Sequence, residues 1–388
     1  MEQVRLGIIG VGNMGTDHAR SLLAGKVPEM ALTAVADINP ARLQWAEENL
    51  PGVARFDDAQ QLMESGLVDA VLVATPHYLH PTLVISALEH GLHVISEKPA
   101  GVYTKAVREM NEAAAKSDKT FAIMFNQRTN CVYRKMKEII DSGELGQIRR
   151  TNWIITNWYR SQSYYDSGSW RATWDGEGGG VLLNQCPHNL DLWQWLCGMP
   201  VKVQAFTHNG KWHDIEVEDD VTAYVEYANG ATGVFITSTG DAPGTNRLEV
   251  TMDGGKLVCD GSTLKMYKLS QDINEFSATY KGGFGMPDVT EIEVETDGEN
   301  PQHPGVLRAF AAHILRGEPL TAEGYEGING LTLSNAMHLS SWLGRAVTLP
   351  LDEDLYYDEL MKRVATSRRK KGGAAVFADT SNTYGGAK

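Results

Sequence analysis

Three short stretches of this sequence carry residue types that bind phosphate or move protons. The first is Gly10-Val11-Gly12-Asn13-Met14-Gly15, a G-x-G-x-x-G pattern. The second is Glu97-Lys98-Pro99, and the third runs from Gly178 to Asp191 and contains Asn184 and His188. An ammonium group can donate a hydrogen bond to a reacting oxygen, and an imidazole can accept a proton near neutral pH. These residues would suit chemistry at a hydroxyl or carbonyl group.

The glycine pattern predicts a dinucleotide site, because it follows an apolar strand and opens a helical pattern. Gly10 can make the sharp turn, Gly12 lets the backbone approach a pyrophosphate, and Gly15 lets the helix pack close to the sheet. The helix then points free N–H groups and the positive end of its dipole at the phosphates. Three glycines alone would equally fit an ordinary tight turn.

Asp37 supports this interpretation and indicates which dinucleotide binds. It ends the next apolar strand, roughly 20 residues beyond the glycines, where an acidic residue binds the ribose hydroxyls. A carboxylate there repels a 2′-phosphate, although Arg42 lies nearby, so we expect NAD rather than NADP. Taken alone, Asp37 could instead cap the helix that begins at Pro40.

Polar residues also end two further strands. Ala74-Thr75-Pro76-His77 ends one, and Glu97-Lys98-Pro99 ends the following one, at the edge where doubly wound sheets bind ligands. His77 and His80 have the spacing of a metal pair, but no third ligand stands out nearby, so we favour a helix start beside the cofactor and expect no metal. Without its neighbours, Glu97-Lys98-Pro99 would be typical of a surface turn.

The third stretch combines a glycine run with an amide and an imidazole. Asn184 and His188 are four residues apart, so on a helix they share one face, and Asp191 could orient the histidine. The alternative is a core histidine on an amphipathic helix. A metal site through Cys186, His188 and Asp191 fits no zinc spacing.

Aromatic and polar residues are concentrated between Asn152 and Asp175. Their rings suit the C–H faces of a sugar, and the polar groups suit its hydroxyls. Part of the stretch must be core, since Trp153 and Ile155 alternate as in a strand, and an oligomer contact is a further alternative. The predicted substrate contacts here are Trp158, Tyr165, Arg171 and Trp174.

The elements around these residues predict two domains. In residues 1–125, short apolar strands alternate with helical patterns, which indicates a doubly wound parallel sheet. The strands expected there are Arg5–Ile9, Leu32–Ala36, Ala70–Ala74, His93–Ser96 and Phe121–Phe125. In residues 126–388, successive strands with short turns indicate a mostly antiparallel sheet with helices. We expect this second domain to bind substrate and to mediate oligomerisation. The tail from about residue 367 is expected to pack loosely.

Composition excludes several classes of function. The 388 residues are 42% hydrophobic and carry a net charge of −14, so we expect no general attraction to nucleic acid or anionic lipid. No apolar stretch is long enough to span a membrane, and the N-terminus lacks the pattern of a secretory signal. The four cysteines show no CxxC spacing and are expected to be reduced. We therefore expect a cytoplasmic protein.

Taken in order, these pieces resemble the family of glucose–fructose oxidoreductase, inositol dehydrogenase and MocA. The resemblance covers about residues 4–200 and rests on Gly7–Gly15, Ala74-Thr75-Pro76, Glu97-Lys98-Pro99, Phe125-Asn126-Gln127-Arg128, Trp170-Arg171, and Gly178–Asp191 with Trp195-Leu196-Cys197-Gly198. It implies a Rossmann domain, an open antiparallel sheet domain, and catalysis between them by Lys98 and His188. Many members carry Asp where this chain has Asn184. Asn cannot ionise, so it can position a substrate hydroxyl while His188 serves as base.

With this resemblance, we expect an NAD-dependent oxidoreductase that acts on a ring hydroxyl or ketone of a sugar, glycoside or inositol, as a homodimer or homotetramer. The alternatives are an NAD-dependent redox glycosidase, which works through a transient keto-sugar, and a non-catalytic dinucleotide-binding regulator. The predicted catalytic residues are Lys98, His188 and Asn184, which would also contact substrate. The predicted cofactor contacts are Gly10, Gly12, Asn13, Met14, Gly15, Asp37, Ile38, Arg42, Ala74, Thr75, Pro76, His77, His80, Glu97, Lys98 and Asn126.

Overall fold

A computed structural model describes residues 2–368 of the chain. The predicted loose tail lies outside the described residues, apart from Ser367 and Arg368. These two contact the carboxylate of Glu216: the Ser367 hydroxyl donates to Oε2 at 2.6 Å, and the Arg368 N–H donates to Oε1. Among the described residues, no helix is both long and apolar enough to cross a lipid bilayer.

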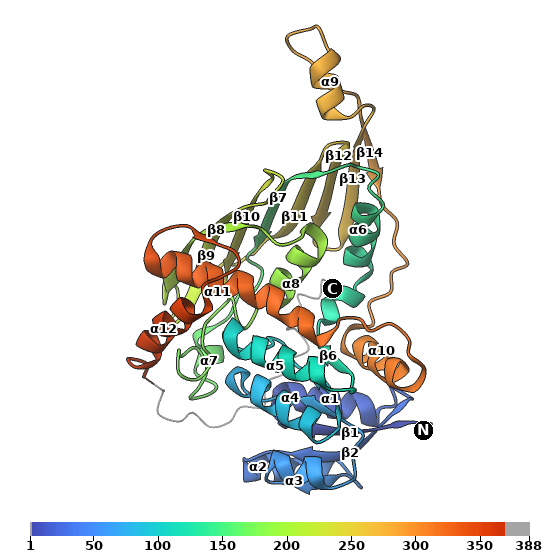
Figure 1. Cartoon of the computed structure of the whole chain (residues 1–388), viewed down its shortest axis with the longest axis vertical. Helices are drawn as coiled ribbons and strands as arrows, with labels where there is room; N and C mark the ends of the chain where they lie inside the picture. Colours follow the sequence, from blue (N-terminus) through green and yellow to red (C-terminus); the bar gives the residue numbers. More distant parts are fainter. Residues whose placement is uncertain (1, 369–388) are drawn as a thin grey trace.

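The first sheet is parallel throughout, which confirms the predicted doubly wound domain (Figure 1). Its strand order is β3-β2-β1-β4-β5-β6. The strands are β1 (Val4–Ile9), β2 (Met30–Ala36), β3 (Ala54–Phe56), β4 (Ala70–Val73), β5 (His93–Ser96) and β6 (Phe121–Ile123). The helices between them are α1 (Asn13–Leu23), α2 (Pro40–Asn49), α3 (Ala59–Glu64), α4 (His80–Glu89) and α5 (Thr104–Lys116).

The predicted strands were found within a few residues of their bounds, but β3 was missed. This strand has three residues, lies at the edge of the sheet, and contains no fully buried side chain. A short, half-exposed edge strand has no continuous apolar run, which is the pattern that identified the other strands.

The second sheet has nine strands in the order β14-β13-β12-β11-β7-β10-β9-β8-β15. Only β7 and β10 pair in parallel, and the other neighbours are antiparallel. The strands are β7 (Ile148–Ile155), β8 (Lys202–Asn209), β9 (Glu218–Glu226), β10 (Thr232–Ser238), β11 (Asn246–Met252), β12 (Gly255–Asp260), β13 (Thr263–Leu269), β14 (Val289–Glu293) and β15 (Val347–Thr348). The mostly antiparallel second sheet is therefore confirmed.

Helices α6 (Cys131–Asp141), α8 (Pro187–Cys197) and α11 (Gly327–Leu343) lie against one face of this sheet (Figure 1). Helix α12 (Glu353–Val364) packs on α11 and α5, and the short α7 (Gln162–Tyr165) lies in the aromatic stretch. Helix α9 (Ile273–Thr279) projects from the sheet beyond β13 and β14 and buries none of its residues. The 3₁₀ turns are η1 (His77–Leu79), η2 (Asn126–Thr129) and η3 (Gly324–Glu326).

Helix α10 (Gln302–Arg316) lies in the second predicted domain by sequence but packs against the first sheet. It comes late in the sequence, yet Leu307 and Phe310 are fully buried in the same apolar cluster as Leu6 and Ile8 of β1. The boundary at residue 125 remains a prediction for the chain, but this helix completes the core of the first sheet.

A buried ion pair joins the turn after β6 to α8. The Arg128 guanidinium donates from Nε and Nη2 to the two carboxylate oxygens of Asp191, at 2.8 and 2.7 Å. Both side chains are almost completely buried, with 3% and 1% of their surface exposed. The same guanidinium donates from Nη1 to Glu326 at the start of α11. The pair therefore fixes α8, and the histidine at its start, against the end of the first sheet.

Candidate active site

The glycine turn after β1 has the geometry that the sequence predicted. Gly10 adopts a φ of +95°, and a Cβ there would lie 2.6 Å from the Ala74 carbonyl oxygen. A Cβ on Gly15 would lie 1.9 Å from the Gly10 oxygen, so only glycine lets α1 begin this close to the turn. Gly12 has nothing within 4 Å of its Cβ position, which leaves room for a ligand to approach the backbone.

The start of α1 fits a phosphate. Gly12 is its N-cap, no side chain caps the helix, and its first turn contains no acidic residue. The first N–H groups of a helix have no partner within the helix, so they can donate to phosphate oxygens. Two predicted cofactor contacts nearby, Thr75 Oγ1 and Asn126 Oδ1, are buried with no hydrogen-bond partner among the described residues. Both atoms are available to a cofactor.

Asp37 ties the end of β2 to the glycine turn. Its Oδ2 accepts from the Val11 N–H at 2.7 Å, and its Oδ1 accepts from the Asn39 N–H at 2.8 Å. The cap of α2 is Asn39, whose side chain accepts from the Ala41 N–H, so the alternative in which Asp37 caps that helix is wrong. A carboxylate has about four acceptor positions, which leaves capacity for ribose hydroxyls. Burial lowers the pKa of Arg42 beside it.

Glu97 and Lys98 do not form a surface turn. Glu97 is 4% exposed, and its Oε1 lies 2.6 Å from His18 Nε2 on α1. Burial raises the pKa of Glu97, but the hydrogen bond and charge of His18 outweigh it and bring that pKa to about 2. The Lys98 Nζ donates to the backbone oxygen of Asn184 at 3.1 Å. Burial lowers the pKa of this lysine below its ordinary value.

His80 fixes the ends of two strands and does not face open space. Its Nδ1 lies 2.7 Å from the Pro99 oxygen, and its Nε2 lies 2.7 Å from the Thr75 oxygen. His77 is buried, and the edge of its ring meets Trp170 at a centroid distance of 6.2 Å. Within residues 2–368, no three His, Cys, Asp or Glu side chains are grouped so as to hold a metal ion.

The glycine run before His188 is held by a carboxylate of the second sheet. Glu218 accepts from the Gly180 N–H at 2.9 Å and from the Leu182 N–H at 3.0 Å. A Cβ on Gly180 would lie 1.9 Å from the Glu218 backbone oxygen, so no other residue fits. His338 of α11 lies 3.0 Å from the same carboxylate, and both side chains are fully buried.

Asn184 lies in the turn before α8 and not on the helix, which corrects the prediction of a shared helical face. Its side-chain amide donates to Glu177 Oε1, and its Oδ1 accepts from the Tyr164 hydroxyl at 3.2 Å. Glu177 is 1% exposed, and its other oxygen accepts from the Ala172 N–H at 2.6 Å. Burial raises the pKa of Glu177, and the Arg171 charge opposes that rise. The network fixes the orientation of the amide.

His188 is the second residue of α8 and is 3% exposed. Burial, followed by the positive charge of Lys98, holds the pKa of His188 well below its ordinary value. Asp191 was the predicted partner of this histidine, but the hydrogen bonds that its carboxylate accepts in the structure come from Arg128 and Gln194. Because Lys98 donates to the Asn184 backbone and its charge acts on His188, the structure brings Lys98, Asn184 and His188 together at the carboxyl end of β5.

The aromatic stretch divides into site and core. Tyr165 is 3% exposed with its hydroxyl on Thr239, and Trp174 is 5% exposed against His338. Both side chains are therefore packed in the core of the domain, and as substrate contacts they stay predictions. Trp158 is half-buried and donates to the Asn189 side chain, and Arg171 donates to the Tyr164 hydroxyl at 2.7 Å.

Three side chains at the site were not predicted from the sequence: Tyr164 as a partner of Asn184, Glu177 and Arg160. The Arg160 guanidinium lies 5.2 Å from the centre of the Tyr164 ring, and the Arg171 guanidinium lies 4.5 Å from it. Glu177 precedes the glycine run directly, so its position next to a predicted site was the only available signal. No local pattern distinguishes it from a surface acid.

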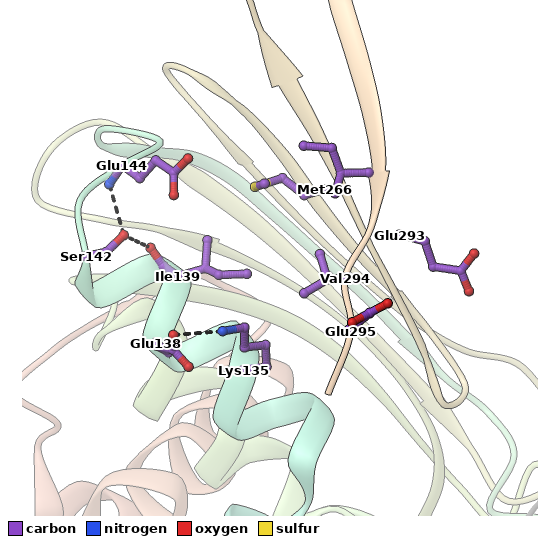
Figure 2. A pocket seen from close by; sticks show the side chains of 10 residues that line it. Lys135, Glu138, Ile139, Ser142, Glu144, Met266, Glu293, Val294 and Glu295 are labelled. Carbon is purple, nitrogen blue, oxygen red and sulfur yellow. Dashed lines mark hydrogen bonds and ion pairs between the residues drawn. The ribbon is translucent and has the colours of Figure 1, made fainter. Parts of the chain in front are cut away.

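A separate pocket lies far from this chemistry, between α6 and the edge of the second sheet (Figure 2). Its volume is about 330 Å³. Met266 and Ile139 point into it, and acidic side chains including Glu138, Glu144 and Glu295 surround it. None of the residues predicted for the active site lines this pocket, so we do not identify it with the substrate site.

Comparisons with known proteins agree with this architecture. Residues 4–125 match the model of an oxidoreductase family with an NAD-binding Rossmann fold. Residues 133–258 match the model of the GFO/IDH/MocA C-terminal domain. The myo-inositol 2-dehydrogenase of Thermotoga maritima is 26% identical over 352 residues, covering 89% of this chain and 98% of the relative.

Two further matches cover different shares of the chain. The rhizopine catabolism protein MocA of Rhizobium meliloti is 31% identical over 199 residues, covering 51% of this chain and 58% of the relative. The WlbA dehydrogenase from Chromobacterium violaceum was solved in complex with NADH and UDP-GlcNAcA. That structure has a TM-score of 0.77 and 29% identity, covering 91% of this chain and 97% of the other.

The Asp37 geometry predicts that NAD(H) binds at least about tenfold more tightly than NADP(H), equivalent to ~1.4 kcal/mol. Asp37→Asn should narrow that difference, because it removes the charge that repels a 2′-phosphate while keeping an acceptor for the Val11 N–H. Titrations of both reduced cofactors by fluorescence measure the ratio, with the exposed Asp118→Asn as control. Equal affinities in the unmodified protein would contradict the assignment.

Asn184→Asp should destabilise the protein, because it replaces the amide that donates to Glu177 with a second buried carboxylate. Losing a hydrogen bond to a charged group costs about 1.5–3 kcal/mol. Like charges raise the pKa of such a pair, so the loss should grow as pH rises and both acids ionise. The double variant Glu177→Gln, Asn184→Asp should restore stability, since it again pairs one amide with one acid. Denaturant unfolding at pH 5 and pH 8 tests this; a single variant as stable as the double variant at pH 8 would contradict it.

Proposed function

Because the chain belongs to the family of glucose–fructose oxidoreductase, inositol dehydrogenase and MocA and uses NAD, we propose that it is a dehydrogenase or reductase of sugars or cyclic polyols. The reaction moves a hydride between NAD and a ring hydroxyl or ketone. The observation that carries the proposal is the 3.1 Å hydrogen bond from Lys98 Nζ to the Asn184 backbone oxygen. It joins the end of a Rossmann strand to the turn that leads into His188.

NAD would lie along the glycine turn, with Gly10, Gly12 and Gly15 allowing its phosphates to reach the start of α1, and with Asp37 binding the adenosine ribose. When bound, NAD accepts or returns the hydride at its nicotinamide. The remaining predicted cofactor contacts stay predictions for this chain. Asn126 supports one of them, since its buried Oδ1 has no partner within the described structure.

Lys98 and His188 have different roles at the substrate oxygen. In oxidation, an imidazole nitrogen of His188 takes the hydroxyl proton, and the Lys98 ammonium donates to the same oxygen and stabilises its developing negative charge. Burial lowers the pKa of both groups. A lowered histidine pKa keeps the imidazole neutral and able to accept a proton at physiological pH. Asn184, fixed by Glu177 and Tyr164, positions a neighbouring hydroxyl.

Three names of relatives support a cyclic polyhydroxy substrate. One relative is a myo-inositol 2-dehydrogenase, one is a rhizopine catabolism protein, and one structure is a complex with NADH and UDP-GlcNAcA. The predicted substrate contacts of the aromatic stretch stay predictions: Trp158, Tyr165, Arg171 and Trp174. A cytoplasmic location and a homo-oligomeric state also remain predictions from the sequence.

The proposal is tested by incubating the protein with NAD and a panel of sugars, inositols and glycosides while following NADH and products together. Net NADH formation from a sugar or polyol is the expected result. Release of an aglycone without net NADH would instead identify a redox glycosidase. Lys98→Met should abolish turnover but change NADH affinity less than about threefold, whereas Lys105→Met, on an exposed lysine of α5, should leave both unchanged. Near-normal turnover in Lys98→Met would contradict its role.

His188→Ala should lower the oxidation rate about 10²–10⁴-fold, the usual contribution of a general base. Oxidation needs the imidazole neutral, and burial depresses its pKa, so the acid limb of the unmodified enzyme should fall below the ordinary 6.5. It needs Lys98 protonated, so the alkaline limb should fall below the ordinary 10.5. Rate profiles from pH 5 to pH 10 measure both limbs. If His188→Ala keeps the acid limb and the rate, another residue is the base.

A further inference from the structure

Positive charge is concentrated at this site in a protein whose net charge is −14. The Lys98 ammonium donates to the Asn184 backbone, the Asn184 side chain accepts from the Tyr164 hydroxyl, and that hydroxyl accepts from Arg171 Nη1 at 2.7 Å. The Arg160 guanidinium lies over the same Tyr164 ring. Three cations therefore lie around one amide and one phenol ring.

The carboxylates nearby leave this charge only partly balanced. Glu97 is bound to His18, and Glu177 shares its two oxygens among the Ala172 N–H, the Asn184 amide and, at 3.5 Å, Arg171. Within residues 2–368, Arg160 has no carboxylate partner. Its Nη1 donates only to the backbone oxygens of Trp158 and Tyr159.

A second donor at the same place has no acceptor. The Arg171 side chain is 14% exposed. Its Nε is buried and has no hydrogen-bond partner among the described residues. A buried donor without an acceptor costs free energy, and more so on a charged group. Stacking against aromatic rings holds both guanidinium planes in place, which prepares them for a planar or tetrahedral anion.

Resting on the proposed function, we propose that the substrate is an anionic sugar or polyol, and that Arg160, with Arg171 beside it, binds its carboxylate or phosphate. Arginine is suited to both groups, because its fork of donors matches two oxygens at once. The anionic group lies toward the aromatic stretch, while the carbon to be oxidised lies between Lys98 and His188.

The surroundings favour Arg160 as the residue that engages the ligand. Arg171 is already committed to Tyr164 and Glu177, so its removal would disturb Asn184. Within residues 2–368, the Arg160 guanidinium donates to the backbone oxygens of Trp158 and Tyr159 and to no side chain. Its remaining N–H groups can therefore turn to a ligand without breaking the Asn184 network. Arg160 is half-buried, and a guanidinium bonded to an anion at a partly buried site contributes more than an exposed pair, because screening by water is weaker.

The test compares neutral sugars with their acids and phosphate esters on the same ring. D-Glucose, D-glucuronate and glucose 6-phosphate, with the corresponding galactose set, are titrated calorimetrically into the protein saturated with NADH. We expect an acid or a phosphate ester to bind at least about tenfold more tightly than its neutral parent, with a gain that falls as salt is added. A gain for the uronates alone identifies a carboxylate, and a gain for the esters alone identifies a phosphate. If no anionic member binds more tightly than its parent, the proposal is overturned.

Variants assign the effect to one residue. Arg160→Gln should lose the anionic gain while the neutral parents keep their affinity, and Arg160→Lys should keep part of it through its charge. Arg345→Gln, on an exposed arginine beyond α11, removes the same charge away from the site and should change nothing. Retention of the gain in Arg160→Gln, or a loss confined to NADH affinity, overturns the proposal; the thermal midpoint of each variant reports its folding.

Failure of this proposal is distinguishable from failure of the proposed function. If the neutral sugars give NADH and no anionic compound binds more tightly than its parent, the proposed dehydrogenase function stands and the proposed binding of an anionic group by Arg160 is overturned. An anionic preference in the NADH complex without NADH formation from any compound would support the binding site and contradict the dehydrogenase.

Discussion

The active site depends on the buried ion pair between Arg128 and Asp191. Removing either partner of such a pair leaves an uncompensated charge in a dry interior, which is far more costly than breaking an exposed pair. The Arg128 guanidinium also lies 5.3 Å from the rings of Phe125 and Trp195, so it cannot turn away. Because Asp191 follows His188 by less than one turn of α8, this pair fixes where the histidine faces.

Other buried carboxylates around the site also hold their partners in place, either backbone N–H groups or polar side chains. Glu97 contacts His18 of α1, and Glu177 accepts from the Asn184 amide. Glu218 contacts both the N–H groups of the glycine run and His338. Each acid comes from a different element, so the site is assembled from several directions. A buried acid is tolerable only when its oxygens are hydrogen-bonded, which is why each of them determines the local conformation.

This arrangement separates the electrostatics of the surface from those of the site. The molecule as a whole repels anions at long range, whereas Lys98, Arg160 and Arg171 create a local excess of positive charge. That excess depresses the pKa of the neighbouring histidines beyond the effect of burial alone. The neutral imidazoles and the proposed preference for an anionic substrate therefore rest on the same charge distribution.

The sequence by itself determined the features that depend on residues close together in the chain. The glycine turn, the strand ends at Asp37 and Lys98, the parallel first sheet and the mostly antiparallel second sheet could be predicted, because local spacing and apolar periodicity encode them. Tertiary structure alone decided which residues face one another. Asp191 pairs with Arg128 rather than with His188, Tyr165 and Trp174 are in the core, and Glu177 and Arg160 join the site. These outcomes depend on partners that are distant in the sequence and compete for one another. Which side chain is buried, and which polar group finds a hydrogen-bond partner, is decided by the packing of the whole chain and not by local patterns.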